Sequence, residues 1–257
     1  MENVFSKISK VNLKTTFKNK KTILEDVYFT APFKVMTPFY KKDDYIKVVV
    51  MSSSAGIMAG DRQEYNINVG ENTKLELTSQ SYEKIHKMEE GKAIRECKIK
   101  VEKNAFLKYS PQPTIPFAKS SFENNIIINL EDNTSKLVLM DIISCGRATS
   151  GEKFQYNLYK SYTEVRCKNK LMYRDNTIYA PKDFKMNGYG FFEGYTHLAN
   201  MFICNFENSS EKIHLIREII EENKEISGGV TLTKNGNICV KILGNSGEIL
   251  SNLCNNI

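Results

Sequence analysis

An alternation of apolar and polar residues with a period of two runs through most of this chain, and it restricts the chain to a sheet-rich fold. Neighbouring side chains of a strand point to opposite faces, so the alternation turns one face of each strand toward a core. Such runs occupy residues 45–51, 65–69, 75–78, 97–101, 126–130, 137–140, 154–165, 171–173 and 201–206. Turn-forming segments separate them, such as 69–72 (VGEN) and 102–105 (EKNA). We therefore predict a mainly β, many-stranded layered fold.

The last fifty residues predict a hairpin and two helices near the C-terminus. Asn-Gly at 235–236 separates two β-prone runs, and both residues accept the positive φ that a tight hairpin turn needs. Asn208 and Glu211 are typical of a helix start, and isoleucines then recur at helical spacing. We expect this helix to run until Ser-Gly-Gly at 227–229 stops it. A shorter helix is expected after Ser246.

Length and composition are those of a chain that buries a sizeable core. It has 257 residues, of which 41% are hydrophobic, and neither a linker nor a long-period repeat is visible, so we expect one domain over 1–257. No stretch reaches the roughly 18 to 20 apolar residues of a membrane span, and the first residues lack a signal-peptide pattern. We expect a cytoplasmic protein without a membrane partner. The net charge of +6 is too diffuse to predict a nucleic-acid partner.

The residue types that usually carry catalysis form no familiar motif. Six cysteines occur without a C-x-x-C pair, which predicts buried reduced thiols rather than a disulfide frame or a zinc site. Three histidines lie in separate segments without the i, i+4 spacing of a helical zinc pair. A nucleophile elbow, a P-loop and a dinucleotide fingerprint are absent from the sequence.

Three carboxylates, Asp61, Asp141 and Glu152, stand beside glycine turns at strand ends. Carboxylates in such places have three possible roles: they can bind a metal ion, they can act as an acid–base pair, or they can pair with nearby Arg62 and Arg147 for structure alone. Spacing alone leaves these three roles open.

A proline-rich segment lies at 110–117 (SPQPTIPF) and holds three of the six prolines. Proline removes backbone donors and fixes φ, so we expect a stiff, extended surface segment or sheet edge rather than a central strand. The segment is either a rigid loop or a preformed recognition edge, in which Phe117 would supply an apolar anchor.

Several ordered segments together resemble one protein family. Residues 54–62 (SAGIMAGDR) are similar to a G-G-x-x-x-G-D-R stretch, with Ser54-Ala55-Gly56 in place of the usual paired glycines, and 77–85 (LTSQSYEKI) to an L-T-T-Q-x-x-x-K-[VI] stretch. Residues 109–118 (YSPQPTIPFA) resemble Y-x-P-x-P-x-I-P-F, while 141–147 (DIISCGR) and 151–154 (GEKF) resemble D-x-x-x-x-G-R and G-E-x-[FW]. On these motifs the chain resembles the UreD family, also called UreH, the accessory proteins of nickel urease maturation.

The resemblance implies a non-enzymatic role and a β-helix-like fold with two helices. UreD-like proteins bind the urease apoprotein and, through UreF, recruit the nickel-carrying GTPase UreG. No tightly bound cofactor is implied, but nickel would pass in transit, and Asp61, Asp141 and Glu152 would line its path, since oxygen ligands guide Ni(II) without trapping it. The motif positions expected to contact partners are Gln80, Lys84, Pro111, Gln112, Pro113, Thr114, Pro116, Phe117 and Arg147.

Two other classes of function stay open on the residues alone. A carboxylate-based hydrolase on a β scaffold would require turnover that depends on Asp61 or Glu152. An RNA-binding β protein would require salt-dependent affinity and aromatic side chains that stack on bases.

Overall fold

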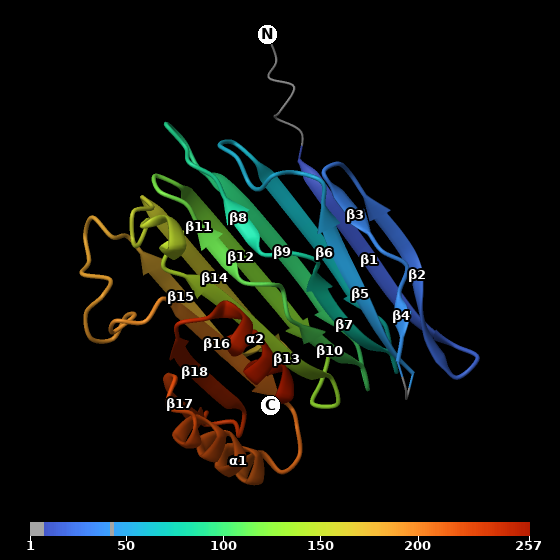
Figure 1. Ribbon diagram of the computed structural model, residues 1–257. Coiled ribbons are helices and arrows are strands. Elements are labelled where there is room, and N and C mark those ends of the chain that lie inside the picture. The colour runs from blue at the N-terminus through green and yellow to red at the C-terminus, as the bar shows by residue number, and fades with distance from the viewer. Residues whose placement is uncertain (1–7, 42–43) are drawn as a thin grey trace.

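Two mixed β-sheets face one another in the computed structural model, which describes residues 8–41 and 44–257 (Figure 1). In spatial order, the seven-stranded sheet consists of β15 (Lys170–Tyr179), β14 (Leu158–Cys167), β12 (Ser121–Leu130), β9 (Ala93–Val101), β6 (Arg62–Val69), β1 (Ser9–Lys18) and β2 (Lys21–Phe29). In spatial order, the main path of the eleven-stranded sheet consists of β17 (Ile226–Leu232), β18 (Ile238–Gly244), β16 (His197–Cys204), β13 (Lys136–Ser144), β10 (Phe106–Tyr109), β7 (Lys74–Ser79), β5 (Tyr45–Ser52) and β3 (Phe33–Val35). Three short strands complete it, β4 (Phe39–Tyr40), β8 (Glu83–Ile85) and β11 (Thr114–Pro116).

The chain winds between the two sheets. From β5 to β14, the long strands fall alternately in one sheet and the other, and neighbours within each sheet are parallel. Parallel neighbours cannot be joined by a tight hairpin, so each connection crosses to the opposite sheet. This winding confirms the mainly β, β-helix-like layered fold.

Equivalent positions of successive turns of the winding lie side by side. Leu13, Ile67, Ile99, Ile128 and Val165 form one register row across five strands, and all five are buried. Removing rows of aliphatic side chains from water contributes most of the favourable free energy of folding. Each apolar position of the period-two alternation therefore corresponds to one core-facing row that runs across the sheet.

The turns at one end of the winding also stack. Asn72 and Asn104 both adopt positive φ, of 63° and 54°, and Asn104 Nδ2 donates to Asn72 Oδ1 at 3.2 Å. Beneath them, the buried hydroxyls of Thr15 and Thr73 lie 2.8 Å apart, and Thr73 Oγ1 donates to the Gly70 carbonyl at 2.6 Å. Side chains thus satisfy the backbone groups that these tight turns leave unpaired.

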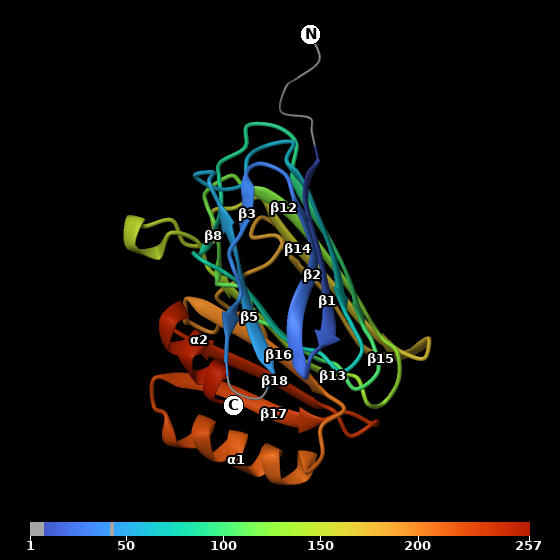
Figure 2. The ribbon, with the colours of Figure 1, turned by 90° about the vertical axis from the view of Figure 1, so that its right-hand side faces the viewer.

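Two helices, α1 (Ser209–Glu222) and α2 (Gly247–Asn256), cover the outer face of the eleven-stranded sheet (Figure 2). Ile213, Ile216 and Ile220 of α1 and Leu250 of α2 pack in one cluster with residues of β13, β16 and β18. The prediction of two C-terminal helices is confirmed, and Ser246 caps α2 by accepting a hydrogen bond from Ile249 N. Asn208 precedes α1 without a side-chain capping bond.

Three local predictions are wrong. The first helix ends at Glu222, since Asn223 is already extended, and 227–229 pair with β18 as part of β17, where Gly228 permits the close approach of the Lys241 carbonyl. Residues 154–157 precede β14, since Phe154 adopts a φ of 55° and packs on Phe192. The proline segment is extended, but it is not an edge, because Thr114 pairs with both β8 and β13.

The predicted hairpin and thiols agree with the structure. β17 and β18 are antiparallel, with Gly236 at a φ of 77° in the turn between them. All six cysteines are free, and five of them are buried. No helix in the described part of the chain is long and apolar enough to cross a membrane.

We predict that Thr73→Val lowers the free energy of unfolding by about 1 to 3 kcal/mol, because it leaves Thr15 and the Gly70 carbonyl without a hydroxyl partner inside the core. The matched control is Thr231→Val on the exposed face of β17, for which we expect a change within about 0.5 kcal/mol. Urea unfolding of both variants measures the difference. Equal losses would remove the buried hydroxyl pair as the cause.

Candidate functional site: a polar layer between the sheets

One register row of the seven-stranded sheet is polar although it faces the interior. Gln63, Arg95, Asn124 and Ser161 follow one another across β6, β9, β12 and β14, and all four are buried. The row lies two residues along the strands from buried Tyr65, Cys97 and Ile126, so it occupies the next inward-facing position.

Arg95 is the centre of this layer. Its Nε and Nη2 donate to Gln63 Oε1 at 2.8 and 2.6 Å, and Nη2 also donates to Glu83 Oε2 of β8 at 2.5 Å. The guanidinium lies over Tyr65 and Phe122 at 5.5 and 5.6 Å from the ring centroids. Burial is the largest single influence and disfavours this charge, but Glu83, Tyr65 and Tyr109 together outweigh it, so the pKa of Arg95 lies above its ordinary value. A buried guanidinium is costly unless it is paired and hydrogen-bonded, so Arg95 depends on both Glu83 and Gln63.

Asp141 faces this layer from the opposite sheet. It stands on β13, where it is paired in register with Asn200 of β16. Burial and the nearby Asp175 carboxylate raise the pKa of Asp141 to about 6, against the opposing influence of Arg95 and Lys241. Asp141 is therefore ionised at neutral pH but close to titration.

Small cavities line up along the layer. A cavity of about 30 Å³ lies among residues that include Glu83, Arg95, Asn124 and Asp141, and a second, of about 20 Å³, among residues that include Asp141, Asp175 and Asn200. Asp141 lines both. Each volume is enough for a water-sized species.

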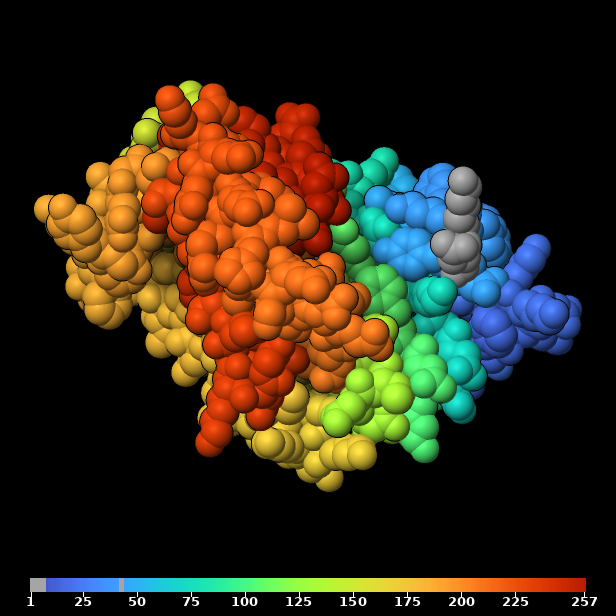
Figure 3. All heavy atoms as spheres, turned by 90° about the horizontal axis from the view of Figure 1, so that it is seen from below, coloured from blue at the N-terminus to red at the C-terminus, as the bar shows by residue number. Residues whose placement is uncertain are grey.

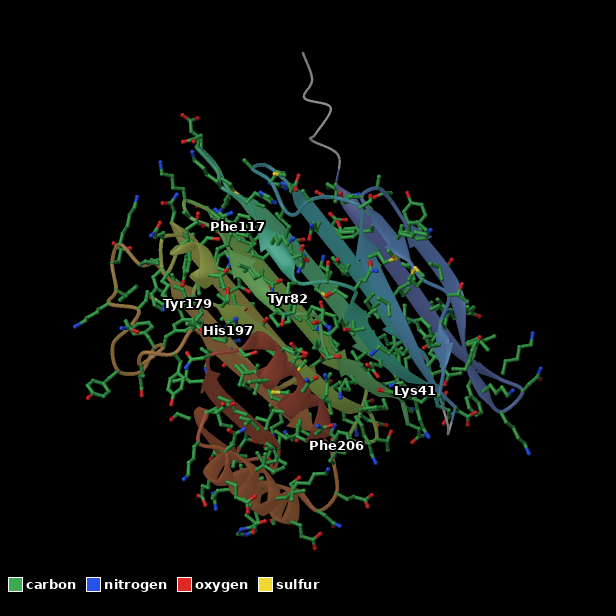
Figure 4. The ribbon with its side chains drawn as sticks, viewed as in Figure 1. Lys41, Tyr82, Phe117, Tyr179, His197 and Phe206 are labelled. Atoms are coloured by element: carbon green, nitrogen blue, oxygen red, sulfur yellow. The ribbon has the colours of Figure 1, made fainter. Side chains whose placement is uncertain are left out.

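The layer reaches the surface on two sides. The first cavity shares Ser79 and Glu83 with an open pocket of about 130 Å³, which Gln80, Tyr82 and Lys84 also line. Tyr82 lies beside α2 in Figure 4, near His197, whose pKa is lowered by burial.

On the other side, the layer ends at β15. Asp175 accepts hydrogen bonds from Tyr173 and Thr177, and its Oδ2 lies 3.3 Å from Lys241 Nζ. Tyr179, labelled in Figure 4, is buried at the same strand.

Two buried amide oxygens in this layer have no hydrogen-bond partner among residues 8–41 and 44–257. Asn124 Oδ1 and Asn200 Oδ1, one in the wall of each small cavity, accept no hydrogen bond from the described residues. Buried acceptors are almost always satisfied, so each calls for a water or a cation. Within residues 8–41 and 44–257, however, no group of three or more His, Cys, Asp or Glu side chains is placed to hold a metal ion.

The structure does not bring the three predicted carboxylates together. Asp61 lies in the loop between β5 and β6, where its Oδ2 accepts from Met58 N at 2.8 Å. Glu152 forms an ion pair with Arg147, whose Nε donates at 2.8 Å, and accepts from Ala118 N at 3.1 Å. Arg147 therefore pairs with Glu152 and not with Asp141. Of the three carboxylates, only Asp141 lines a cavity of the interior layer.

Glu152 and Arg147 belong to a surface stack with Phe117. The Arg147 guanidinium lies 4.3 Å from the Phe117 ring centroid, and the His86 ring lies 4.8 Å from it on the β8 side. Gly146 makes the tight approach possible, with a φ of 126° and with the Glu152 carbonyl 2.2 Å from where a Cβ would stand. Phe117 is half-buried and lies near the upper end of the molecule in Figure 4.

The other predicted contact residues divide between surface and interior. Gln80 and Lys84 are exposed, and Pro111 and Gln112 are half-buried. Pro113, Thr114 and Pro116 are buried. Pro113 lies under the start of α2, since a Cβ at Gly247 would be 3.2 Å from it.

Sequence reasoning missed Arg95, Glu83 and Asp175. Arg95 interrupts an otherwise apolar set of alternate residues in β9 (AIRECKIKV), and this break in the pattern is the signal that could have identified it. Glu83 and Asp175 lie in half-exposed strands, where a carboxylate has no sequence signature of its own.

Parallel strands wound between two sheets around a polar layer define a β-solenoid-like scaffold with a buried charged interior. The family model described as the UreD urease accessory protein matches residues 7–257. The UreH urease accessory protein of Helicobacter pylori (strain G27) is 40% identical over 254 residues, which cover 98% of this chain and 94% of the relative. The UreD urease accessory protein of Acetivibrio thermocellus is 36% identical over 255 residues, covering 98% and 97%. The chain belongs to the UreD family of urease accessory proteins.

We predict that the raised pKa of Asp141 makes the fold less stable as pH rises. Its folded pKa of about 6 exceeds the unfolded value of about 4, so protonation favours the folded state, and this contribution is lost between about pH 4 and pH 6. The loss should be about 1 to 3 kcal/mol and absent from Asp141→Asn. Urea unfolding of both proteins from pH 4 to pH 7 measures it. A constant difference between them across this range would contradict the assignment.

Proposed function

We propose that this protein is a non-catalytic scaffold that binds the urease apoprotein and, with UreF and UreG, supports nickel insertion into the urease active site. Membership of the UreD family supports the role in urease maturation. The observation that carries the nickel step is the pair of cavities that meet at Asp141.

We propose that nickel crosses the protein along the polar layer. It would enter beside Glu83 and Tyr82, pass Asp141 and leave beside Asp175. The interior route contains three carboxylates, Glu83, Asp141 and Asp175, and two cationic side chains, Arg95 and Lys241. The excess negative charge favours a cation.

The donor atoms of this route suit transit rather than storage. They are carboxylate, amide and hydroxyl oxygens, which hold Ni(II) less firmly than imidazole or thiolate sets. The unpartnered Asn124 and Asn200 oxygens would replace part of the hydration shell that the ion sheds in cavities this small. Arg95 is held by Glu83 and Gln63, which limits its repulsion of the ion.

The role proposed for Asp141 is tested by its amide. Asp141→Asn keeps the size of the side chain and removes the charge, so nickel loading of urease should fall roughly tenfold, the loss expected for about 1.4 kcal/mol of weaker attraction. Recovery of the complex with UreF and urease should be unchanged. The measurements are the nickel content of urease after activation and the yield of the accessory complex.

Asp61→Asn and Glu152→Gln are the matched controls, because both carboxylates lie outside the cavity walls. The sequence hypothesis places them on the nickel path as well, and equal losses for all three variants would support it. Full nickel loading by all three would remove the path and leave only the scaffold. Loss of the complex by Asp141→Asn would make this carboxylate structural.

The surface stack at Phe117 is the proposed partner contact. Phe117→Ala should weaken binding to UreF or to apo-urease by at least about tenfold, as for an aromatic anchor at an interface, while thermal unfolding changes little. If the ring is a core residue instead, stability falls by about 3 to 5 kcal/mol. The control is Phe184→Ala, since Phe184 is also an aromatic stacked on another ring, Phe191, but lies in the loop after β15. Calorimetry and a binding titration separate these outcomes, and loss of stability without selective loss of binding contradicts the contact.

A further inference from the structure

A second concave site lies at the opposite end of the winding from Phe117, where the turns between the sheets stack. It is an open cleft of about 1030 Å³. Figure 3 views the molecule from this end, and Phe206 marks it in Figure 4. Its lining includes Phe106, Met172 and Phe206 together with Lys136, Lys168 and Lys170.

The rim of the cleft is basic. Lys136 begins β13, whereas Lys168 and Lys170 lie together at the turn between β14 and β15. Glu207 is the one carboxylate among the described lining residues. None of these three lysines takes part in an ion pair among residues 8–41 and 44–257. The cleft therefore concentrates positive charge in a concave surface, where field lines are focused.

The floor of the cleft is apolar and aromatic. Phe106 and Phe206 meet edge to face, with their centroids 5.9 Å apart and their planes at 88°, and half-buried Met172 lines the same cleft. The ammonium groups of Lys136 and Lys212 lie 5.7 and 5.8 Å from the Phe206 centroid. Two lysines are thus positioned by one ring.

Hydrogen bonds fix the loop that carries Phe206. Asn205 Nδ2 donates to the Ser135 carbonyl at 2.8 Å, and Asn205 N donates to Asn237 Oδ1 at 3.1 Å. Lys170 Nζ donates to Asn235 Oδ1 at 3.3 Å across the cleft. The site is therefore formed before any ligand binds, which lowers the entropic cost of binding.

We propose that this cleft binds an acidic peptide segment of a partner protein, one that carries an aromatic side chain between its carboxylates. The carboxylates would pair with Lys136, Lys168 and Lys170, and the aromatic ring would lie on Phe106 and Phe206. A small anion would leave the aromatic floor uncovered, and the open cleft is as large as the largest usual small-molecule pockets. The inference rests on this geometry alone and is independent of the nickel path.

The test measures binding of the fluorescent peptide Glu-Glu-Phe-Glu-Glu to the full chain by anisotropy. Replacing Lys136, Lys168 and Lys170 together by Gln should weaken binding about tenfold or more and flatten its salt dependence, because three charge contacts are lost. The matched control replaces Lys18, Lys98 and Lys185 by Gln, which makes the same change in net charge at exposed positions elsewhere. Circular dichroism melting verifies that both triple variants fold.

Two further arms identify the ligand. Phe206→Leu keeps an apolar side chain and removes the ring, so it should weaken binding of the Phe peptide by a larger factor than binding of an all-Glu pentapeptide, which loses only the positioning of Lys136. Inorganic phosphate and ATP, added at concentrations that give the same total negative charge as the peptide, should displace the fluorescent peptide poorly. Equal weakening by the two triple variants, equal affinity of the two peptides, or efficient displacement by phosphate or ATP would each overturn the proposal.

Discussion

The parallel pairing of strands within each sheet is the constraint from which the rest of this structure follows. A parallel neighbour cannot be reached through a tight hairpin, and in this chain each crossover runs through the opposite sheet, so the chain winds. Winding places equivalent residues of successive turns in one row, as for Ile67, Ile99 and Ile128. One substitution in a strand therefore acts on a whole row, because the neighbours in that row contact one another across the sheet.

The placement of equivalent residues in one row also explains how a polar layer is accommodated inside the fold. Gln63, Arg95 and Asn124 form one row, so each polar group has the next as a neighbour. Apolar clusters lie on both sides of the row, one including Cys97 and the other Phe122. These clusters supply the stability that a buried guanidinium does not, since replacing a buried ion pair by apolar side chains is often neutral or stabilising.

Sequence reasoning predicts the periodic parts of this protein and misses what depends on long-range contacts. The alternation predicts the strands because it reflects burial, and Asn235-Gly236 predicts the hairpin because it reflects local backbone freedom. Ser-Gly-Gly at 227–229 is misread as a helix stop because its pairing in β17 depends on β18, a strand that follows it in sequence, and Gly228 permits the close approach of the Lys241 carbonyl. The site divides in the same way: Asp141 is identified from its motif, whereas Glu83 becomes part of the layer only when β8 is placed over Arg95.

The two ends of the winding carry different side chains because the backbone adopts different conformations at each end. At the stacked turns, residues such as Asn72 and Asn104 must adopt positive φ, which selects short polar side chains and leaves room around them. Asn104 of these turns lines the basic cleft at Phe206. At the other end, the connections are long and pack on one another, and Gly146 permits the close approach that fixes Arg147 against Phe117. A wound scaffold thus separates two surfaces and an interior layer that can change independently, because each depends on different residues of the same strands and turns.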